Sequence, residues 1–165
     1  MWYNGYLEQA RSDWNAYNIL QVAPISNCHA LHYLQMTTEK LGKALLLAYG
    51  ITNLDAVRRT HRAFTRFLQI AARNHGLQRE LGMTGSQLRA HLQQLLPIAY
   101  EIEKLAPALA NGGANVEYPW EAPPGTINVP ASYNFPVSSI LLLSKGRNLL
   151  KLIKVTLDRF YSLFI

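Results

Sequence analysis

A polar stripe on the segment Asn27–Gly50 holds residues whose types and spacing could do chemistry. It consists of four side chains at intervals of three or four residues: His32, Gln35, Glu39 and Lys43. Residues at this spacing share one face of an α-helix. Histidine can transfer a proton, and the charged groups beside it can bind a charged ligand. The stripe therefore consists of residue types that could do chemistry.

The arginines that follow this segment are a second set of candidates. Between Arg58 and Arg79 the chain has six arginines and no acidic residue. Helical spacing predicts that four of them share one side of a third helix: Arg58, Arg62, Arg66 and Arg73. Arginine binds phosphate through bidentate hydrogen bonds and charge neutralisation, so this side is a candidate for phosphate contacts. The alternative is a solvated helix face without a ligand.

Thiol and metal chemistry are less favoured by the pattern. Cys28 could be a nucleophile with His29 and His32 nearby, but a small buried residue near a helix start is the preferred interpretation. The two histidines are three residues apart with no nearby third ligand. We therefore expect no zinc site and predict no cofactor. A single cysteine also excludes an intramolecular disulfide.

Amphipathic spacing and capping residues mark the helices that must position these side chains. The 165 residues are 49% hydrophobic, which is enough for one domain with a single core. Helices are predicted over about residues 6–22, 27–50, 84–102 and 137–164, with a third helix beginning after Asn53 or Asp55. Thr84 and Gln87 form a capping-box pattern, and Pro97 should kink or split the fourth helix. The sequence predicts an all-α, up-and-down bundle of about five helices.

The segment Asn111–Pro136 has a different composition from the rest. It contains five prolines, three glycines and no lysine or arginine. Because prolines interrupt each short apolar run, we expect a long irregular loop rather than a pair of strands. Its apolar side chains are expected to pack along the bundle or against another subunit. Asn134 or Ser138 is expected to cap the helix that follows.

The order of these helices resembles that of the HEPN domain family, named for nucleotide binding in higher eukaryotes and prokaryotes. The matching residues of the second helix are Gln35, Glu39, Lys40, Lys43, Ala44, Leu45, Leu46 and Gly50. Ala10 and Asp13 match an Ala-x-x-Asp pattern in the preceding helix. The dipeptide Tyr118–Pro119 lies before the last helix, as it does in that family.

This resemblance implies a dimeric helical domain that binds a nucleotide or RNA phosphate, or a protein partner. Asp13 would face the polar centre of the bundle and pair with Lys40 or Lys43. His61 is similar to a histidine near the start of the third helix in many members. Similar domains are partners of small nucleotidyltransferases, or components of toxin–antitoxin and phage-defence systems. The resemblance therefore implies that a protein partner of this kind is possible. The predicted ligand-binding residues are Asp13, His32, Gln35, Glu39, Lys43, Arg58, Arg62, Arg66 and Tyr118.

Many HEPN proteins are metal-independent endoribonucleases that use an arginine followed after about four to six residues by a histidine. None of the histidines in this chain has an arginine at that spacing before it. The leading hypothesis is therefore a non-catalytic, homodimeric HEPN-like domain. One alternative is a divergent endoribonuclease that uses His32, Glu39 and arginines of the third helix. Another is a structural or adaptor bundle without a phosphate ligand.

The two ends of the chain bear on location. The first residues lack a basic region followed by an apolar run, so no signal peptide is predicted. No apolar stretch approaches the ~18 residues needed to span a bilayer. The basic last helix could be a membrane-surface anchor, but its regular apolar stripe favours packing in the bundle. We expect a cytoplasmic protein without a membrane partner.

Overall fold

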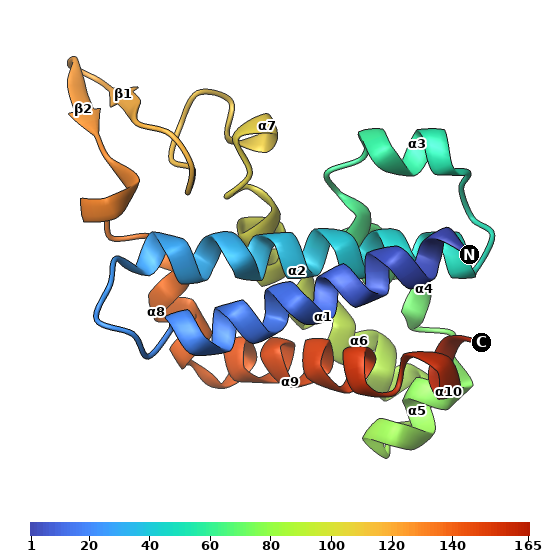
Figure 1. Ribbon diagram of the computed structural model, residues 1–165. Coiled ribbons are helices and arrows are strands. Elements are labelled where there is room, and N and C mark those ends of the chain that lie inside the picture. Colours follow the sequence, from blue (N-terminus) through green and yellow to red (C-terminus); the bar gives the residue numbers. More distant parts are fainter.

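The computed structural model describes residues 1–165 and is mostly helical, which confirms the all-α class (Figure 1). The first half contains α1 (Trp2–Leu20), α2 (Asn27–Ala48), α3 (Leu54–Arg59), α4 (Ala63–Ala71) and α5 (His75–Leu81). The second half contains α6 (Gly85–Glu103), α7 (Pro107–Ala110), β1 (Trp120–Ala122), β2 (Thr126–Asn128), a 3-10 turn (Pro130–Ser132), α8 (Pro136–Leu142), α9 (Ser144–Asp158) and α10 (Phe160–Phe164).

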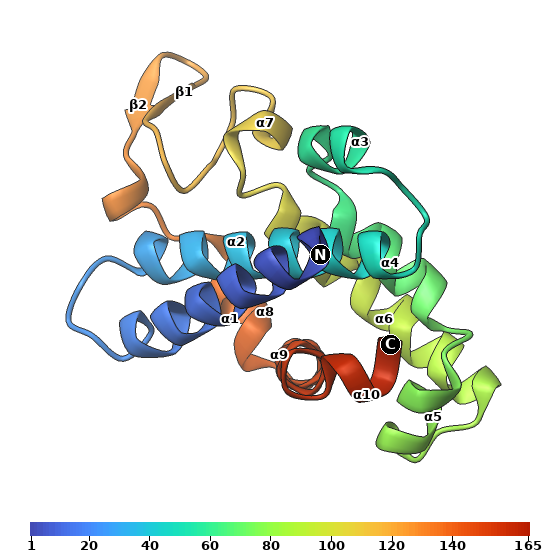
Figure 2. The ribbon, with the colours of Figure 1, turned by 45° about the vertical axis from the view of Figure 1, so that its right-hand side comes forward.

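Helix α2 is the central element. Helix α1 packs along it in the opposite direction, and α4 packs on another of its sides (Figure 1). Helix α6 contacts α2, α4 and α9, and α9 is seen nearly end-on below the α1–α2 pair in Figure 2. One continuous cluster of 34 buried apolar residues joins these helices. The ends of the chain lie near each other, since the Tyr161 hydroxyl is 3.3 Å from Asn4 Oδ1.

The first two helices lie close to their predicted positions. Helix α1 begins four residues earlier than expected, at Trp2. Helix α2 begins at Asn27 and ends before Gly50, whose φ of +64° is typical of a glycine after a helix. Cys28 is buried and burial raises the pKa of its thiol, which fits the structural role predicted for it.

The sequence predicted a single helix, the third of the chain, after Asn53 or Asp55. This prediction is wrong, because the chain leaves helical geometry twice there. Thr60 is extended, with φ −88° and ψ 134°, and separates α3 from α4. Asn74 is extended and caps α5 by accepting a hydrogen bond from Leu77 N. Its side-chain amide also donates to the carbonyl of Leu163 at 2.8 Å, so a tertiary contact fixes this break. Asn53 caps α3, as predicted.

The predicted last helix is likewise divided into three. The chain is extended at Leu143, and Arg159 leaves helical geometry with φ −106°. Neither Asn134 nor Ser138 caps α8: Phe135 occupies the capping position and Pro136 begins the helix. The backbone of Ile140 and Leu141 lies so close to Gly146 that a Cβ there would overlap it.

Helix α6 has the predicted capping box, with Thr84 and Gln87 each bonded to the other's backbone. The helix does not split at Pro97 and continues to Glu103. Pro97 is exposed, whereas Leu95, Ile98 and Ala99 around it are buried. Burial on both sides of the proline outweighs the single backbone hydrogen bond that it removes.

The prediction that residues 111–136 contain no strand pair is wrong. Strands β1 and β2 form an antiparallel hairpin in which Glu121 pairs with Ile127. Pro123 and Pro124 lie in the turn rather than in the strands, and Gly125 supplies the positive φ of 99° there. The expected packing along the bundle is confirmed in part, since Trp120 and Phe135 are buried in the main core.

Candidate functional site

Helix α4 is fixed at its first turn by two neighbouring helices. On α2, Gly42 lets the backbone of α4 approach so closely that a Cβ at this position would lie 2.5 Å from Phe64 N. On α6, the Glu103 carboxylate accepts hydrogen bonds from Phe64 N, Thr65 N and the Thr65 hydroxyl, at 3.1, 3.0 and 2.9 Å. These bonds satisfy backbone donors that a helix N-terminus leaves free. The position of α4 is therefore determined on both sides.

The Glu103 side chain is almost entirely inaccessible, with 1% of its surface exposed. Burial raises the pKa of this carboxyl above its ordinary value. The hydrogen bonds from Thr65 and Phe64 and the charge of Arg62 act in the opposite direction and offset part of this increase. Glu103 thus serves as an internal cap for α4, which carries Arg66 and begins directly after Arg62.

A groove lined by arginines runs between α4 and α6. It consists of two adjoining hollows of about 440 Å³ each, which share Gln69 and Leu96. The first hollow is further lined by Thr60, Arg62, Thr65, Arg66 and Tyr100, and the second by Leu68, Ala72, Arg73, Arg89, Leu92 and Gln93. We call both hollows together the α4–α6 groove. No acidic side chain lines it.

The four arginines of the groove are available to a ligand. All four side chains are exposed, and none forms an ion pair or donates a hydrogen bond within the chain: Arg62, Arg66, Arg73 and Arg89. Arg62 lies over the Tyr100 ring, 5.1 Å from its centroid, and Lys104 lies at the same distance from that ring. Such contacts orient a guanidinium group without neutralising it. The groove therefore holds four positively charged guanidinium groups whose hydrogen-bond donors are free.

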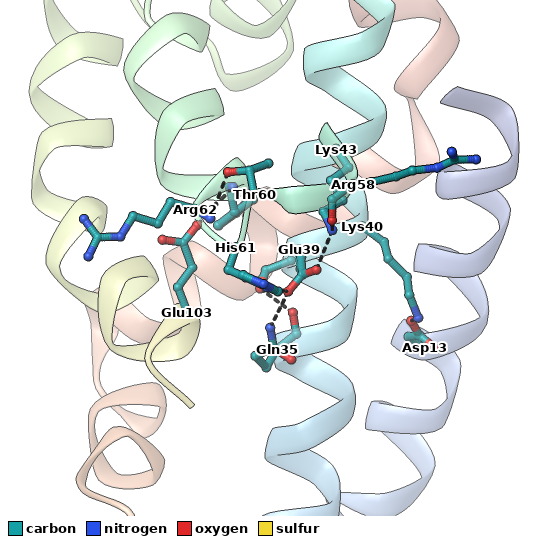
Figure 3. A network of polar contacts seen from close by, with 12 residues as sticks. Asp13, Gln35, Glu39, Lys40, Lys43, Arg58, Thr60, His61, Arg62 and Glu103 are labelled. Carbon is teal, nitrogen blue, oxygen red and sulfur yellow. Dashed lines mark hydrogen bonds and ion pairs between the residues drawn. The ribbon is translucent and has the colours of Figure 1, made fainter. Parts of the chain in front are cut away.

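Three residues of the polar stripe of α2, Gln35, Glu39 and Lys43, form a closed network with His61 instead of an open site (Figure 3). Glu39 accepts hydrogen bonds from Lys43 Nζ at 2.7 Å and Gln35 Nε2 at 3.0 Å, and His61 Nδ1 lies 3.4 Å from it. Burial alone would raise the pKa of Glu39, but Lys43, Gln35 and His61 together lower it below its ordinary value. Glu39 and Lys43 are thus paired within the chain and are not free to bind a ligand.

Replacing Lys43 by methionine is expected to lower the free energy of unfolding by about 3 kcal/mol at neutral pH, because the buried Glu39 carboxylate loses its lysine partner and keeps only Gln35 and His61. In the native protein the pKa of Glu39 is depressed, so this group stabilises the fold when the pH is above the ordinary pKa of a glutamate. This contribution is lost as the pH falls through the folded pKa. Without Lys43, burial dominates and raises that pKa, so the variant should instead gain stability on acidification.

Urea unfolding of both proteins from neutral to acidic pH checks this expectation. Lys154→Met is the matched control, because Lys154 pairs with Asp158 at an exposed site and should cost less than about 1 kcal/mol. A loss in Lys43→Met no larger than in this control would contradict the role assigned to the buried pair.

Asp13 pairs with Lys40, one of its two predicted partners. The Nζ–Oδ2 distance is 2.6 Å, and Asp13 is buried. Lys43, the other candidate, pairs with Glu39 instead. The pair joins α1 to α2 and is also bonded to Gln9. It stabilises the arrangement of the central helices.

Three other predicted residues lie apart from the groove. Arg58 does not share a side with Arg62, because the break at Thr60 separates their helices, and Figure 3 shows their guanidinium groups pointing in opposite directions. Arg58 instead lies over the Trp2 ring at 5.2 Å. His32 Nδ1 is 3.8 Å from Glu117, and no hydrogen bond or ion pair joins it to Glu39 or to the groove arginines. Tyr118 is exposed.

The sequence interpretation did not identify Tyr100, Arg89 and Glu103 as parts of the site. Glu103 follows Ala99 by four residues and so continues the buried stripe of α6, which is a signal for a buried acid that needs partners. Tyr100 and Arg89 are eleven residues apart on the same helix and carry no recognisable motif. Only the packing of α6 beside α4 brings them to the arginines.

Comparison with known proteins adds no relative. No family model, curated protein or solved structure matches the chain. The HEPN resemblance therefore stays a prediction. None of the helices combines the length and hydropathy required to cross a bilayer.

Proposed function

We propose that this protein is a non-catalytic helical domain that binds the phosphate groups of RNA or a nucleotide in the α4–α6 groove. The observation that carries the proposal is the set of four exposed, unpaired arginines in a groove without an acid. Arginines held in this way offer bidentate donors and charge neutralisation to phosphate. A homodimer and a nucleotidyltransferase-type protein partner belong to the same proposal, but they rest on the HEPN resemblance alone.

The positions of the two predicted arginines also support this function. Arg62 is the N-cap residue of α4 and Arg66 lies in its first turn, and both side chains line the first hollow. The buried cap at Glu103 fixes the turn from which they extend. A fixed backbone turn keeps the two side chains beside the same hollow, so binding there does not have to order the turn itself.

Replacing Arg62 and Arg66 together by alanine should weaken binding of RNA at low salt by at least about tenfold, because two charge-assisted contacts are lost. The slope of log affinity against log salt concentration should become flatter by about 0.7 for each lost contact. Fluorescence anisotropy with a labelled RNA, at about 50 mM and about 200 mM salt, measures both quantities.

The matched control is Lys145→Ala/Lys151→Ala, which removes the same charge from exposed positions on α9. Equal losses in the two double variants would mean that only net charge matters, and the groove would be rejected as the site. Unchanged binding in Arg62→Ala/Arg66→Ala would reject it as well. The same samples are examined for RNA cleavage without metal. Cleavage that disappears in His32→Ala would replace the non-catalytic assignment by the endoribonuclease alternative.

A further inference from the structure

We propose that the ligand of the groove is a single strand of nucleic acid that lies along its whole length, and that Arg73 and Arg89 bind the phosphates of the second hollow. This inference rests on the proposed function and goes beyond it, because it assigns two further binding residues and the class of ligand. A free mononucleotide is the ligand that it rejects.

The groove extends along both α4 and α6. Helices α4 and α6 run in opposite directions beside it, since Arg62 meets Tyr100 at one end while Arg73 and Arg89 line the other. Arg62 and Arg73 are eleven residues apart along one side of the groove, and Tyr100 and Arg89 are eleven residues apart on α6 along the other side. At about 1.5 Å per helical residue, the groove is about 16 Å long.

Positive charge is distributed along the whole length of the groove. Arg62 and Arg66 occupy the first hollow, Arg73 and Arg89 occupy the second, and the neutral Gln69 lies between them. Along the axis of a stacked strand successive phosphates are about 3.4 Å apart, so about five such spacings cover the groove length of about 16 Å. The phosphates of a nucleoside triphosphate are joined by single bridging oxygens and are too close together to reach both pairs.

The groove has one aromatic side chain on which a base could stack. Tyr100 is the aromatic side chain that lines the groove, and Arg62 and Lys104 both lie against its ring. A base would have to displace these cations before it could stack there. The other polar side chains near the middle and far end are Gln69 and Gln93. Recognition should therefore depend on phosphates and vary little with base sequence.

The test compares ligands of increasing length on the intact protein and on Arg73→Ala/Arg89→Ala. The probes are labelled oligouridylates from dinucleotide to dodecanucleotide, with ATP and a duplex of the longest sequence as competitors. In the wild-type protein the affinity should increase with length up to about five nucleotides and then level off. The double variant should bind the dinucleotide as the wild type does and lose the increase with length. Arg79→Ala/Lys145→Ala removes equal charge elsewhere and should retain that increase.

Each result distinguishes the inference from the function on which it rests. If ATP or the dinucleotide binds as tightly as the longer strands, the single-strand inference fails and phosphate binding stands. The inference is also overturned if the duplex binds more tightly than the single strand. It is overturned as well if the affinity of Arg73→Ala/Arg89→Ala increases with ligand length as much as that of the wild type. If no probe shows salt-dependent binding, the proposed function itself fails. An oligodeoxyribonucleotide of the same length shows whether the 2′-hydroxyl contributes.

Discussion

Replacing Glu103 by alanine is expected to lower the free energy of unfolding by about 3 kcal/mol, because two backbone N–H groups and one hydroxyl lose their acceptor. These donors lie at the first turn of α4, where no helical carbonyl can replace the carboxylate. Denaturant unfolding measures the loss. Because α4 would also lose its fixed start, the variant should bind RNA more weakly even under conditions in which it remains folded.

Glu103→Gln is the matched control for this loss. The amide oxygen can still accept the two backbone hydrogen bonds, so we expect a cost below about 1.5 kcal/mol. Similar losses for alanine and glutamine would show that the negative charge, rather than the set of hydrogen bonds, stabilises α4. A negligible loss in both variants would contradict the capping role.

The pH dependence of the same pair tests the electrostatic state of Glu103. Its folded pKa is raised above the ordinary value of 4.5, so the folded state binds the proton more readily than the unfolded state. The contribution of this group to stability is therefore greatest at acidic pH and falls as the pH rises through the folded pKa. Relative to Glu103→Gln, the wild-type protein should lose stability over that window. An increase with pH would mean that the carboxylate is stabilised in its charged form.

The positional relations predicted from the sequence that the structure confirms join residues on the same segment or on neighbouring helices. Arg62, the N-cap residue of α4, and Arg66, in its first turn, line the same hollow, and the Asp13–Lys40 pair joins two consecutive helices. Helical periodicity predicts the first of these relations, and the HEPN resemblance implied the second. The same periodicity placed Arg58 beside them, because neither glycine nor proline marks the break at Thr60.

The remaining parts of the candidate site depend on contacts between distant segments. Phe64 and Thr65 are held by Glu103, nearly forty residues later, through bonds at about 3 Å that no local pattern indicates. The break at Asn74 is likewise fixed by Leu163 at the far end of the chain. Tertiary contacts thus override a continuous helical pattern, and they decide which arginines face the groove.

Replacing Gly42 by alanine is expected to lower the free energy of unfolding by about 3 kcal/mol, because the added methyl group would overlap the backbone of Ala63 and Phe64. The atoms that it meets belong to the first turn of α4, which Glu103 holds from the other side, so they cannot move away at little cost. The control is Gly5→Ala, since a Cβ at Gly5 meets no atom within 4 Å and alanine favours the helix. That variant should be as stable as the wild type or up to about 1 kcal/mol more stable.

The Gly42 variant also tests the link between packing and binding. If α4 moves outward to accommodate the methyl group, Arg62 and Arg66 move with it relative to Tyr100 on α6. The Gly42→Ala protein should then bind labelled RNA more weakly than Gly5→Ala at a temperature at which both are folded. Unchanged stability in Gly42→Ala would show that α4 does not pack against α2 at this distance. Reduced stability with unchanged RNA binding would instead separate the groove from the packing that is argued to position it.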